Sequence, residues 1–308
     1  MPRIIVTGAA GRLGSAVIGQ LLRIAPQSLV AVTTRDPQAA RSWSDERVEV
    51  RRGDFDHPST LPDAFRGAER LLIISTSADN ATRIRQHRNA FEAAREAGVG
   101  HVYYTSVMQR EGSPFLAAKG HLQSEVDLVH AAARSTVFRN GQYMENFPLF
   151  LRVGLEGDTI NLPADGPTSW VALHDLAEGI AHVLAGEEAA QDSQILTLTG
   201  PEAVDFTDIA RIAGKALGRH IERKVISPEA FVERVTRQGL SHGFAQVLES
   251  GFRSRASGEL STVDPALQQI VGRRLRRVED ELPLLLEKMT EGNDRWAARF
   301  REAERVTS

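Results

Sequence analysis

The sequence predicts an α/β fold: a doubly wound parallel sheet followed by a smaller, mostly helical C-terminal lobe. Two observations indicate this fold class. Short apolar runs alternate with helical patterns through the first half of the 308 residues, and a glycine-rich turn follows the first apolar run directly. Repeated strand–helix units require parallel strands joined by right-handed crossovers, so helices are expected on both faces of the sheet.

The periodicity of apolar residues places each element of the first half. Short β-prone runs predict strands at 4–7, 29–34, 48–51, 71–75, 101–105 and 136–139. The helical spacing predicts helices at 11–24, 61–65, 83–97 and 121–133. The run at 71–75 is continuously apolar except for its last residue, as expected for a strand buried on both faces.

The regular alternation of strand and helix patterns ends after residue 140. Residues 141–169 are rich in Gly, Pro and Asn and are expected to be mostly loop, a helix is expected at 175–184, and a further sheet strand at 195–199. From 205 onward the pattern is mostly helical. We therefore expect a first domain of residues 1–139 plus 170–199, a substrate-binding lobe of 140–169 plus 200–290, and a tail of 291–308. Trp296 and Phe300 on that tail can dock on the body or on a second copy, so a homodimer is one expected arrangement.

Composition excludes several function classes. The chain has no cysteine, so disulfides, thiolate nucleophiles and cysteine metal sites are excluded, and the scattered histidines predict no metal. The formal net charge of -3 and the short apolar runs argue against nucleic-acid and membrane partners. The basic run Arg273–Arg277 is interpreted as a solvated helix face. A cytoplasmic protein is expected.

The glycine-rich turn has the sequence T-G-A-A-G-R-L-G from Thr7 to Gly14 and lies between the first strand and the first helix. Gly8 permits a tight turn, Gly11 lets backbone approach a pyrophosphate, and Gly14 allows close packing of helix on strand. The helix amino terminus then faces the phosphates. This context predicts a dinucleotide on a Rossmann-type domain, and the expected contacts are Gly8, Ala10, Gly11, Arg12, Leu13 and Gly14.

The end of the second strand bears on the choice of dinucleotide. Sites that prefer NAD place an acidic residue there to bond the ribose 2′-hydroxyl, whereas Arg35 can pair with a 2′-phosphate, with added charge from Arg12. Asp36 is the alternative acidic residue, but its position before Pro37 favours a turn. We therefore expect NADPH in preference to NADH.

Two further loops contribute candidates for cofactor binding. Asp54 and Phe55 follow the third strand and can reach the adenine, although an ordinary turn explains them equally well. Ser75, Thr76 and Ser77 end the fourth strand, where small hydroxyls suit close approach to a ribose; loop capping is the alternative.

Together these motifs resemble the NmrA-like branch of the atypical short-chain dehydrogenase/reductases, and within it bacterial NAD(P)H:quinone oxidoreductases and triphenylmethane reductases. The remaining marks of the resemblance are Gln86–Asn89, Tyr104-Thr105-Ser106, His121-x-x-Ser124-Glu125 and Arg139-Asn140-Gly141-x-Tyr143-x-Glu145-Asn146. The resemblance covers about residues 3–285. It implies NADPH bound across the first half, with Tyr104, Thr105 and Asn140 as additional contacts, and an electrophile held by the second lobe.

One departure constrains the chemistry. Ordinary short-chain dehydrogenases use a Tyr-x-x-x-Lys pair for proton transfer, and the corresponding stretch here begins with Phe115 and ends with Lys119. Phenylalanine donates no proton, so alcohol oxidation is disfavoured, whereas a quinone or conjugated cation accepts hydride readily and water protonates the product. Lys119 either holds the nicotinamide ribose or is a surface lysine, and His121 is either catalytic or structural.

The candidate catalytic residues are Tyr143, Lys119, Ser106 and His121. Tyr143 follows Asn140 and Gly141 at the end of the sixth strand, where its ring can stack on a flat acceptor; a buried core tyrosine is the alternative. The expected function is NADPH-dependent hydride transfer to a quinone or similar conjugated electrophile. Two alternatives stay open: a non-enzymatic NADP(H)-sensing regulator, and a carbonyl reductase that uses Lys119 and Ser106. A cavity lined by Tyr143, Phe147 and the 200–290 lobe favours an enzyme.

Overall fold

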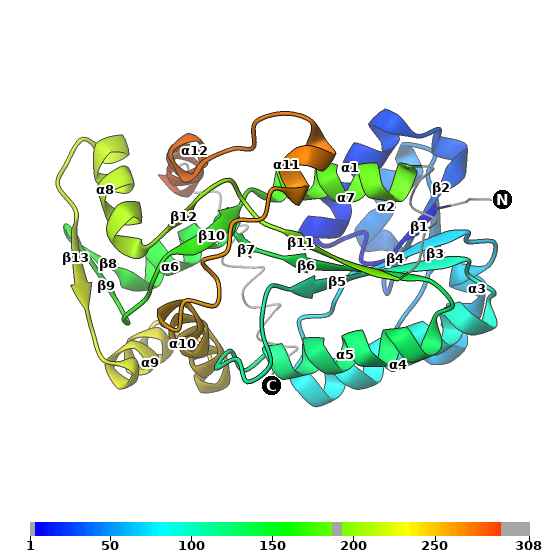
Figure 1. Ribbon diagram of the computed structural model, residues 1–308, viewed down its shortest axis with the longest axis horizontal. Coiled ribbons are helices and arrows are strands. Elements are labelled where there is room, and N and C mark those ends of the chain that lie inside the picture. Colours follow the sequence, from blue (N-terminus) through cyan, green and yellow to red (C-terminus); the bar gives the residue numbers. More distant parts are fainter. Residues whose placement is uncertain (1–3, 187–192, 291–308) are drawn as a thin grey trace.

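The computed structural model describes residues 4–186 and 193–290 and contains a central seven-stranded sheet (Figure 1). The strand order is β11-β6-β5-β4-β1-β2-β3, and all neighbours are parallel. The strands are β1 (Ile4–Val6), β2 (Val30–Thr34), β3 (Glu49–Arg52), β4 (Arg70–Ile73), β5 (His101–Val107), β6 (Ser135–Asn140) and β11 (Gln194–Leu198). The order reverses between β1 and β4, so a ligand crevice is expected outside the carboxyl ends of these strands.

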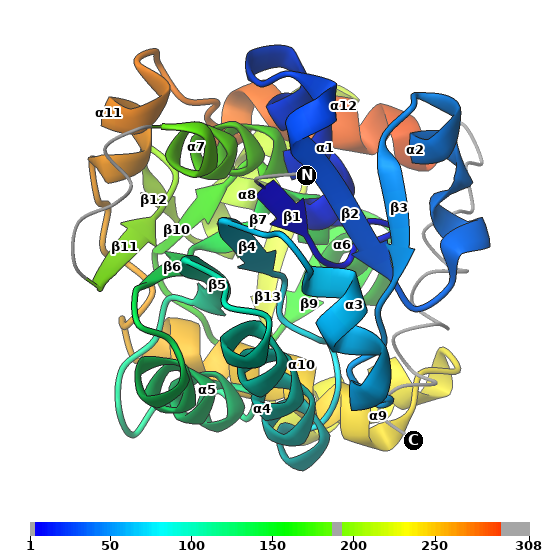
Figure 2. The ribbon, with the colours of Figure 1, turned by 90° about the vertical axis from the view of Figure 1, so that its right-hand side faces the viewer.

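Helices cover both faces of the sheet, as Figure 2 shows. One face carries α1 (Arg12–Ile24), α7 (Leu173–Ala185) and the short α11 (Ala266–Val271), and the other carries α3 (Leu61–Phe65), α4 (Asn80–Glu96) and α5 (Ala118–Ala131). The short α2 (Arg41–Asp45) packs beside β3. Single turns of 3-10 helix occur at Gln27–Leu29, Pro37–Ala40, Pro58–Thr60 and Met144–Asn146. The doubly wound fold and the elements predicted for its first half are confirmed.

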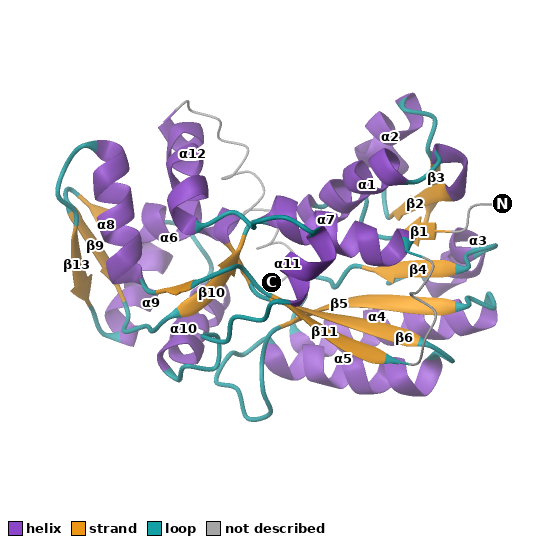
Figure 3. Ribbon diagram, turned by 45° about the horizontal axis from the view of Figure 1, so that its top comes forward, coloured by secondary structure: helices purple, strands orange, loops and turns teal. Residues whose placement is uncertain are grey.

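A lobe with its own apolar core lies beyond the carboxyl ends of the strands (Figures 1 and 3). Its helices are α6 (Phe147–Gly154), α8 (Phe206–Leu217), α9 (Pro228–Arg237), α10 (His242–Ala256) and α12 (Val278–Thr290). Two small sheets complete it: β7 (Gln142–Tyr143), β10 (Thr168–Val171) and β12 (Ala203–Val204), and β8 (Leu155–Glu156), β9 (Thr159–Leu162) and β13 (Glu222–Val225). The division into two domains stays a prediction, and α11, which lies within the predicted lobe range 200–290, packs instead with the core of the sheet through Leu267.

The prediction that residues 141–169 are mostly loop is wrong. The segment forms α6 and four short strands, because α6 is buried on almost every side and therefore shows no polar stripe. Its strands have two to four residues, too few to display an alternating pattern.

The basic run Arg273–Arg277 is not a solvated helix face. It lies in the connection between α11 and α12, where Arg273 pairs with Asp175 and Glu178, and Arg277 pairs with Glu202. The tail with Trp296 and Phe300 lies outside the described residues. No helix within 4–186 or 193–290 combines the length and apolarity needed to cross a bilayer.

Candidate active site

The glycine-rich turn leaves the start of α1 open. Gly8 has φ +67°, a left-handed conformation that disfavours other residues, and a Cβ on Gly14 would lie 2.3 Å from the Gly8 carbonyl oxygen. Gly11 occupies the N-cap position of α1 and is exposed, and no side chain in the described part of the chain caps this helix end. The uncapped N–H groups and the helix dipole therefore suit an anionic group such as a pyrophosphate.

Arg12 connects this turn to the start of the lobe. Its Nη1 donates to the Glu145 carbonyl oxygen at 3.3 Å, and its Nη2 donates to Asn146 Oδ1 at 3.1 Å. The Glu145 carboxylate in turn accepts from the backbone N–H of Leu173, the first residue of α7, at 2.9 and 3.1 Å. Burial raises the pKa of Glu145, although these backbone bonds and the Arg12 charge oppose that shift. The predicted role of Arg12 at a 2′-phosphate stays a prediction.

At the end of β2, Arg35 is exposed and forms no ion pair with any described residue. Asp36 Oδ1 accepts from the backbone N–H of Gln38 at 2.9 Å, which confirms the interpretation of Asp36 as a turn residue. A guanidinium is therefore available at this strand end, while the neighbouring carboxylate caps its own turn.

The loop after β3 holds Asp54 within a turn. Its Oδ1 accepts from the backbone N–H of Asp56 at 3.0 Å, and its Oδ2 lies 2.9 Å from His57 Nδ1. Burial raises the pKa of Asp54, but these bonds and the charges of His57 and Arg35 outweigh burial and lower it. The contacts are those of an ordinary turn, and Phe55 packs on the apolar core beneath it. Contact of Asp54 or Phe55 with an adenine stays a prediction.

The carboxyl ends of β4, β5 and β6 present buried polar atoms. Ser75 N–H donates to Thr105 Oγ1 at 2.9 Å, whereas Thr76 Oγ1 is buried without a partner among the described residues. Asn140 Nδ2 donates to the Tyr143 hydroxyl at 3.2 Å, and Asn140 Oδ1 is likewise buried without a described partner. Unpartnered buried oxygens cost free energy, so these two oxygens at the carboxyl edge are candidates for bonds to another molecule.

Tyr143 lies beside this edge and is partly buried. Burial raises the pKa of Tyr143, an effect that the hydrogen bond from Asn140 and the Arg12 charge only partly offset. Burial therefore keeps the phenol protonated, and because Asn140 is the donor in their hydrogen bond, the phenol proton is not used there and can be donated elsewhere.

The other three candidate catalytic residues lie on the sheet face covered by α5, or on α5 itself. Ser106 Oγ donates to Glu125 Oε1 at 2.5 Å, and Glu125 pairs with Arg139 at 2.5 Å. Lys119 is exposed and makes no hydrogen bond or ion pair within the described residues. His121 is buried, with Nδ1 3.1 Å from the Tyr104 hydroxyl. The structure thus pairs Ser106 with Glu125, leaves Lys119 exposed, and joins His121 to Tyr104, an association that sequence spacing did not reveal.

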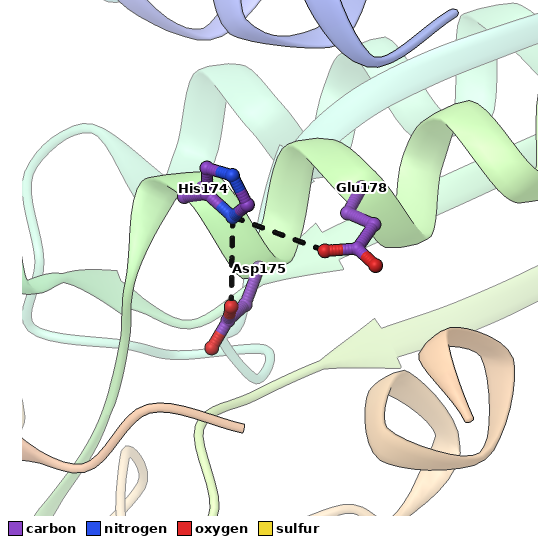
Figure 4. A group of neighbouring side chains, drawn as sticks. All are labelled: His174, Asp175 and Glu178. Carbon is purple, nitrogen blue, oxygen red and sulfur yellow. Dashed lines mark ion pairs between the residues drawn. The ribbon is translucent and has the colours of Figure 1, made fainter. Parts of the chain in front are cut away.

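A cluster at the start of α7 has the composition of a metal site (Figure 4). His174 Nδ1 lies 3.8 Å from both Asp175 Oδ1 and Glu178 Oε2. Arg273 Nη2, however, bonds the same two carboxylate oxygens at 2.7 and 2.5 Å, so a guanidinium already supplies the cation. The cluster braces α7 against the connection before α12.

A cavity of about 920 Å³ lies between α9 and α10 in the lobe, with Leu116 of the connection before α5 on its wall. Its other lining residues include Val232, Thr236 and Gln246. The expected cavity lined by Tyr143 and Phe147 is not this one, and Phe147 is fully buried against Trp170 and Phe206.

Comparisons with known proteins agree with this fold and show the family. The sequence profile of the NmrA-like family matches residues 2–279. The NmrA-like family domain-containing oxidoreductase flvB of Aspergillus flavus is 33% identical over 280 residues, covering 88% of this chain and 91% of the relative. Quinone oxidoreductase 2 of Escherichia coli is 31% identical over 270 residues, covering 87% and 93%.

Solved structures give the same result. The NADPH-dependent quinone oxidoreductase of Escherichia coli, complexed with NADPH, has a TM-score of 0.86 at 29% identity, covering 92% of this chain and 99% of that one. Citrobacter sp. triphenylmethane reductase, complexed with NADP(H), has a TM-score of 0.83 at 29% identity, with the same coverage. NmrA, a negative transcriptional regulator solved with NAD, is 16% identical and shows the fold alone.

Proposed function

Because the chain belongs to the NmrA-like family, we propose that it is an NADPH-dependent oxidoreductase that delivers hydride to a quinone or similar conjugated electrophile. The observation that carries this proposal is the open amino terminus of α1 above a turn in which a Cβ on Gly14 would collide with backbone. Its similar relatives include oxidoreductases, and two solved neighbours were complexed with NADPH or NADP(H).

Different residues of the chain are proposed to bind different parts of NADPH. The turn from Gly8 to Gly14 offers backbone N–H groups to the pyrophosphate, and Arg35 offers a guanidinium to the 2′-phosphate. The unpartnered oxygens of Thr76 and Asn140 lie at the strand ends where the nicotinamide half is expected. When bound, NADPH supplies the hydride.

Tyr143 is proposed to bind the acceptor. Asn140 fixes its oxygen, and its free proton can polarise a carbonyl of the acceptor while the ring stacks on a flat molecule. The cavity between α9 and α10 offers a volume in the range of small-molecule sites, beside the connection that leads to α5. We assign the outer part of the acceptor to this cavity.

Oxidation of NADPH in the presence of a quinone panel tests the function directly. Turnover is expected with at least one quinone; tight NADPH binding without turnover of any quinone or conjugated cation would favour a non-enzymatic regulator.

The cavity is tested by Thr236→Trp, which fills it, against Ala230→Trp, an exposed position of α9 outside the lining. We expect Thr236→Trp alone to raise the acceptor KM, with the affinity for NADPH unchanged in both.

The two alternatives gain less support. The likeness to the regulator NmrA is confined to the fold. For the carbonyl-reductase alternative, Ser106 bonds Glu125, and no hydrogen bond joins it to Lys119 within the described residues. A cytoplasmic location and a homodimer stay predictions.

A further inference from the structure

The cavity between α9 and α10 has an apolar wall that the rest of the structure holds in place. Leu116 lies on this wall and is 46% exposed. Its backbone N–H donates to Ser250 Oγ of α10 at 3.1 Å, and its carbonyl oxygen accepts from Asn80 Nδ2 of α4 at 2.7 Å. Together with Pro228 and Val232 of α9, Leu116 therefore gives the cavity a preformed apolar surface.

One carboxylate of the same wall is buried. Among the described charged residues that line the cavity, only Glu249 is buried, with 7% exposed. Its Oε2 accepts from Nε of Arg253, one turn further along α10, at 3.0 Å. Its Oε1 has no hydrogen-bond partner within 4–186 and 193–290. Because a buried carboxylate oxygen without a partner costs free energy, Oε1 suits a hydrogen-bond donor that enters the cavity.

The charges on the wall determine which donor suits this position. The lining contains three carboxylates, two guanidinium groups and an imidazole: Glu229, Glu233, Glu249, Arg237, Arg253 and His242. Arg237 lies 3.7 Å from Glu233, and Arg253 bonds Glu249, so each guanidinium already has a carboxylate partner. Glu229 forms no ion pair with a described residue. The carboxylates are thus in excess of the guanidinium groups, which favours a cationic donor over a neutral or anionic one.

We propose that this cavity binds a protonated amine on an apolar arm, with Glu249 Oε1 accepting an N–H of the ammonium group. Leu116 and Val232 pack against the arm. The inference rests on the proposed function where it assigns the arm to the acceptor, which then carries a basic amino group remote from its reacting ring. Glu249 is in this case a specificity-determining residue.

The amine and the reacting ring have separate roles. An aliphatic ammonium group is not conjugated with the ring, so its charge is the same before and after hydride transfer. Glu249 therefore stabilises the bound acceptor and the transition state equally. Uniform binding of this kind lowers KM and leaves kcat unchanged.

Equilibrium binding to the full-length protein with NADPH tests the amine site without turnover. Phenethylamine and phenethyl alcohol share an apolar body and differ only in the polar group. We expect ligand-observed NMR titrations to show at least roughly tenfold tighter binding of the amine, the effect of one charge-assisted hydrogen bond. Equal affinities of the amine and the alcohol, or binding of neither, would overturn the proposal.

Two variants that break the same ion pair should act in opposite directions. Glu249→Gln removes the carboxylate charge and should abolish the preference for the amine, whereas Arg253→Gln removes a competing cation and should tighten amine binding. If the pair only braced α10, both variants would weaken binding alike. Melting temperatures show that each variant is folded. Asp208→Asn and Arg211→Gln break an exposed pair on α8 outside the cavity and should leave amine binding unchanged.

Kinetics with two matched acceptors test whether the amine belongs to the acceptor. A benzoquinone with a dimethylaminopropyl arm and its isostere with an isohexyl arm have the same ring and nearly the same shape. Glu249→Gln should raise the KM of the amine-bearing quinone at least roughly tenfold. The kcat values, the KM of the isostere and the affinity for NADPH should hold.

Equal changes of KM with the two quinones would show that the amine is not read through the acceptor and would overturn the assignment. A fall in kcat with both would overturn it as well, because Glu249 would then act on the ring. Absence of turnover in the unmodified protein would instead contradict the proposed function, while the phenethylamine titrations still decide whether Glu249 binds an amine.

Discussion

The two faces of the central sheet differ in the polar side chains that they bury. The face under α1 and α7 packs Val6, Leu72 and Phe138 into an apolar core and also buries polar side chains, among them His101 and Thr136 at the amino ends of β5 and β6. The face under α4 and α5 buries hydroxyls, imidazoles and a carboxylate, among them Tyr104, Ser106, His87 and Glu125. The second face also has an apolar core, but the side chains between β5, α4 and α5 add a connected set of hydrogen bonds to it.

The two faces correspond to two kinds of binding site, one made of backbone and one made of side chains. On the α1 face, the proposed ligand contacts come from backbone that can approach closely because side chains are missing, as at Gly8 and Gly14. On the α5 face, side-chain donors are oriented by buried partners that cost free energy when unpaired. Substitutions in the glycine turn on the first face should therefore alter ligand binding. Substitution of Glu125 on the second face, which bonds Ser106 and Arg139, should alter stability.

The largest effect is expected at Gly14. A Cβ in Gly14→Ala would lie 2.3 Å from the Gly8 carbonyl oxygen, so the turn must open and NADPH affinity should fall by at least about a hundredfold. Isothermal titration measures this loss. Gly19→Ala, in the same helix with nothing within 4 Å of its Cβ, should bind NADPH normally and gain about 0.5–1 kcal/mol of stability. Equal binding by both variants would refute the role of the turn.

Arg35→Ala should weaken NADPH by roughly tenfold to a hundredfold, because it removes a charge-assisted pair worth about 1.5–3 kcal/mol. NADH carries no 2′-phosphate, so its affinity should hold. Arg23→Ala, an exposed arginine at the end of α1, is the control. If Arg35→Ala weakens both cofactors equally, the side chain packs and does not read the phosphate.

On the α5 face, Glu125→Gln should cost about 2 kcal/mol of unfolding free energy, because Arg139 loses its charged partner in a largely buried pair. Chemical denaturation measures the change, and NADPH affinity should hold. Asp127 lies on the same helix as Glu125, and its ion pair with Arg88 of α4 is more exposed. Asp127→Asn, which breaks this pair, should cost less than about 1 kcal/mol of unfolding free energy. A matching loss in NADPH affinity would show that the two faces are not independent.

The smallest effect is expected for Tyr143→Phe, which keeps the ring and removes a hydroxyl on the α1 side of the sheet. Because one hydrogen bond is worth about 1 kcal/mol, kcat/KM for a quinone should fall roughly fivefold while the melting temperature and NADPH affinity hold. If stability falls by about 1 kcal/mol and turnover per folded molecule is unchanged, Tyr143 is a core residue that only completes the Asn140 contact.

Much of the sheet and its cofactor turn were predictable because their signals are local. The strand–turn–helix around Gly8 is encoded within about a dozen residues, and apolar periodicity placed every strand up to Asn140 and the helices α1, α3, α4 and α5, but not the short α2. The same reasoning failed at 141–169, because α6 is packed from all sides by the lobe and its burial pattern has no polar face to show its period.

Tertiary structure alone decided which side chains meet. Arg12 bonds Asn146 across 134 residues, and His87 bonds Ser124 across 37, although each stood in a recognisable motif. A hydrogen bond depends on distance and direction in space, and sequence spacing constrains these only within one helix or strand. The sequence of this protein therefore determines its residue types and local turns, whereas the packing of α4 and α5 on β5 decides the partners of His121 and Ser106.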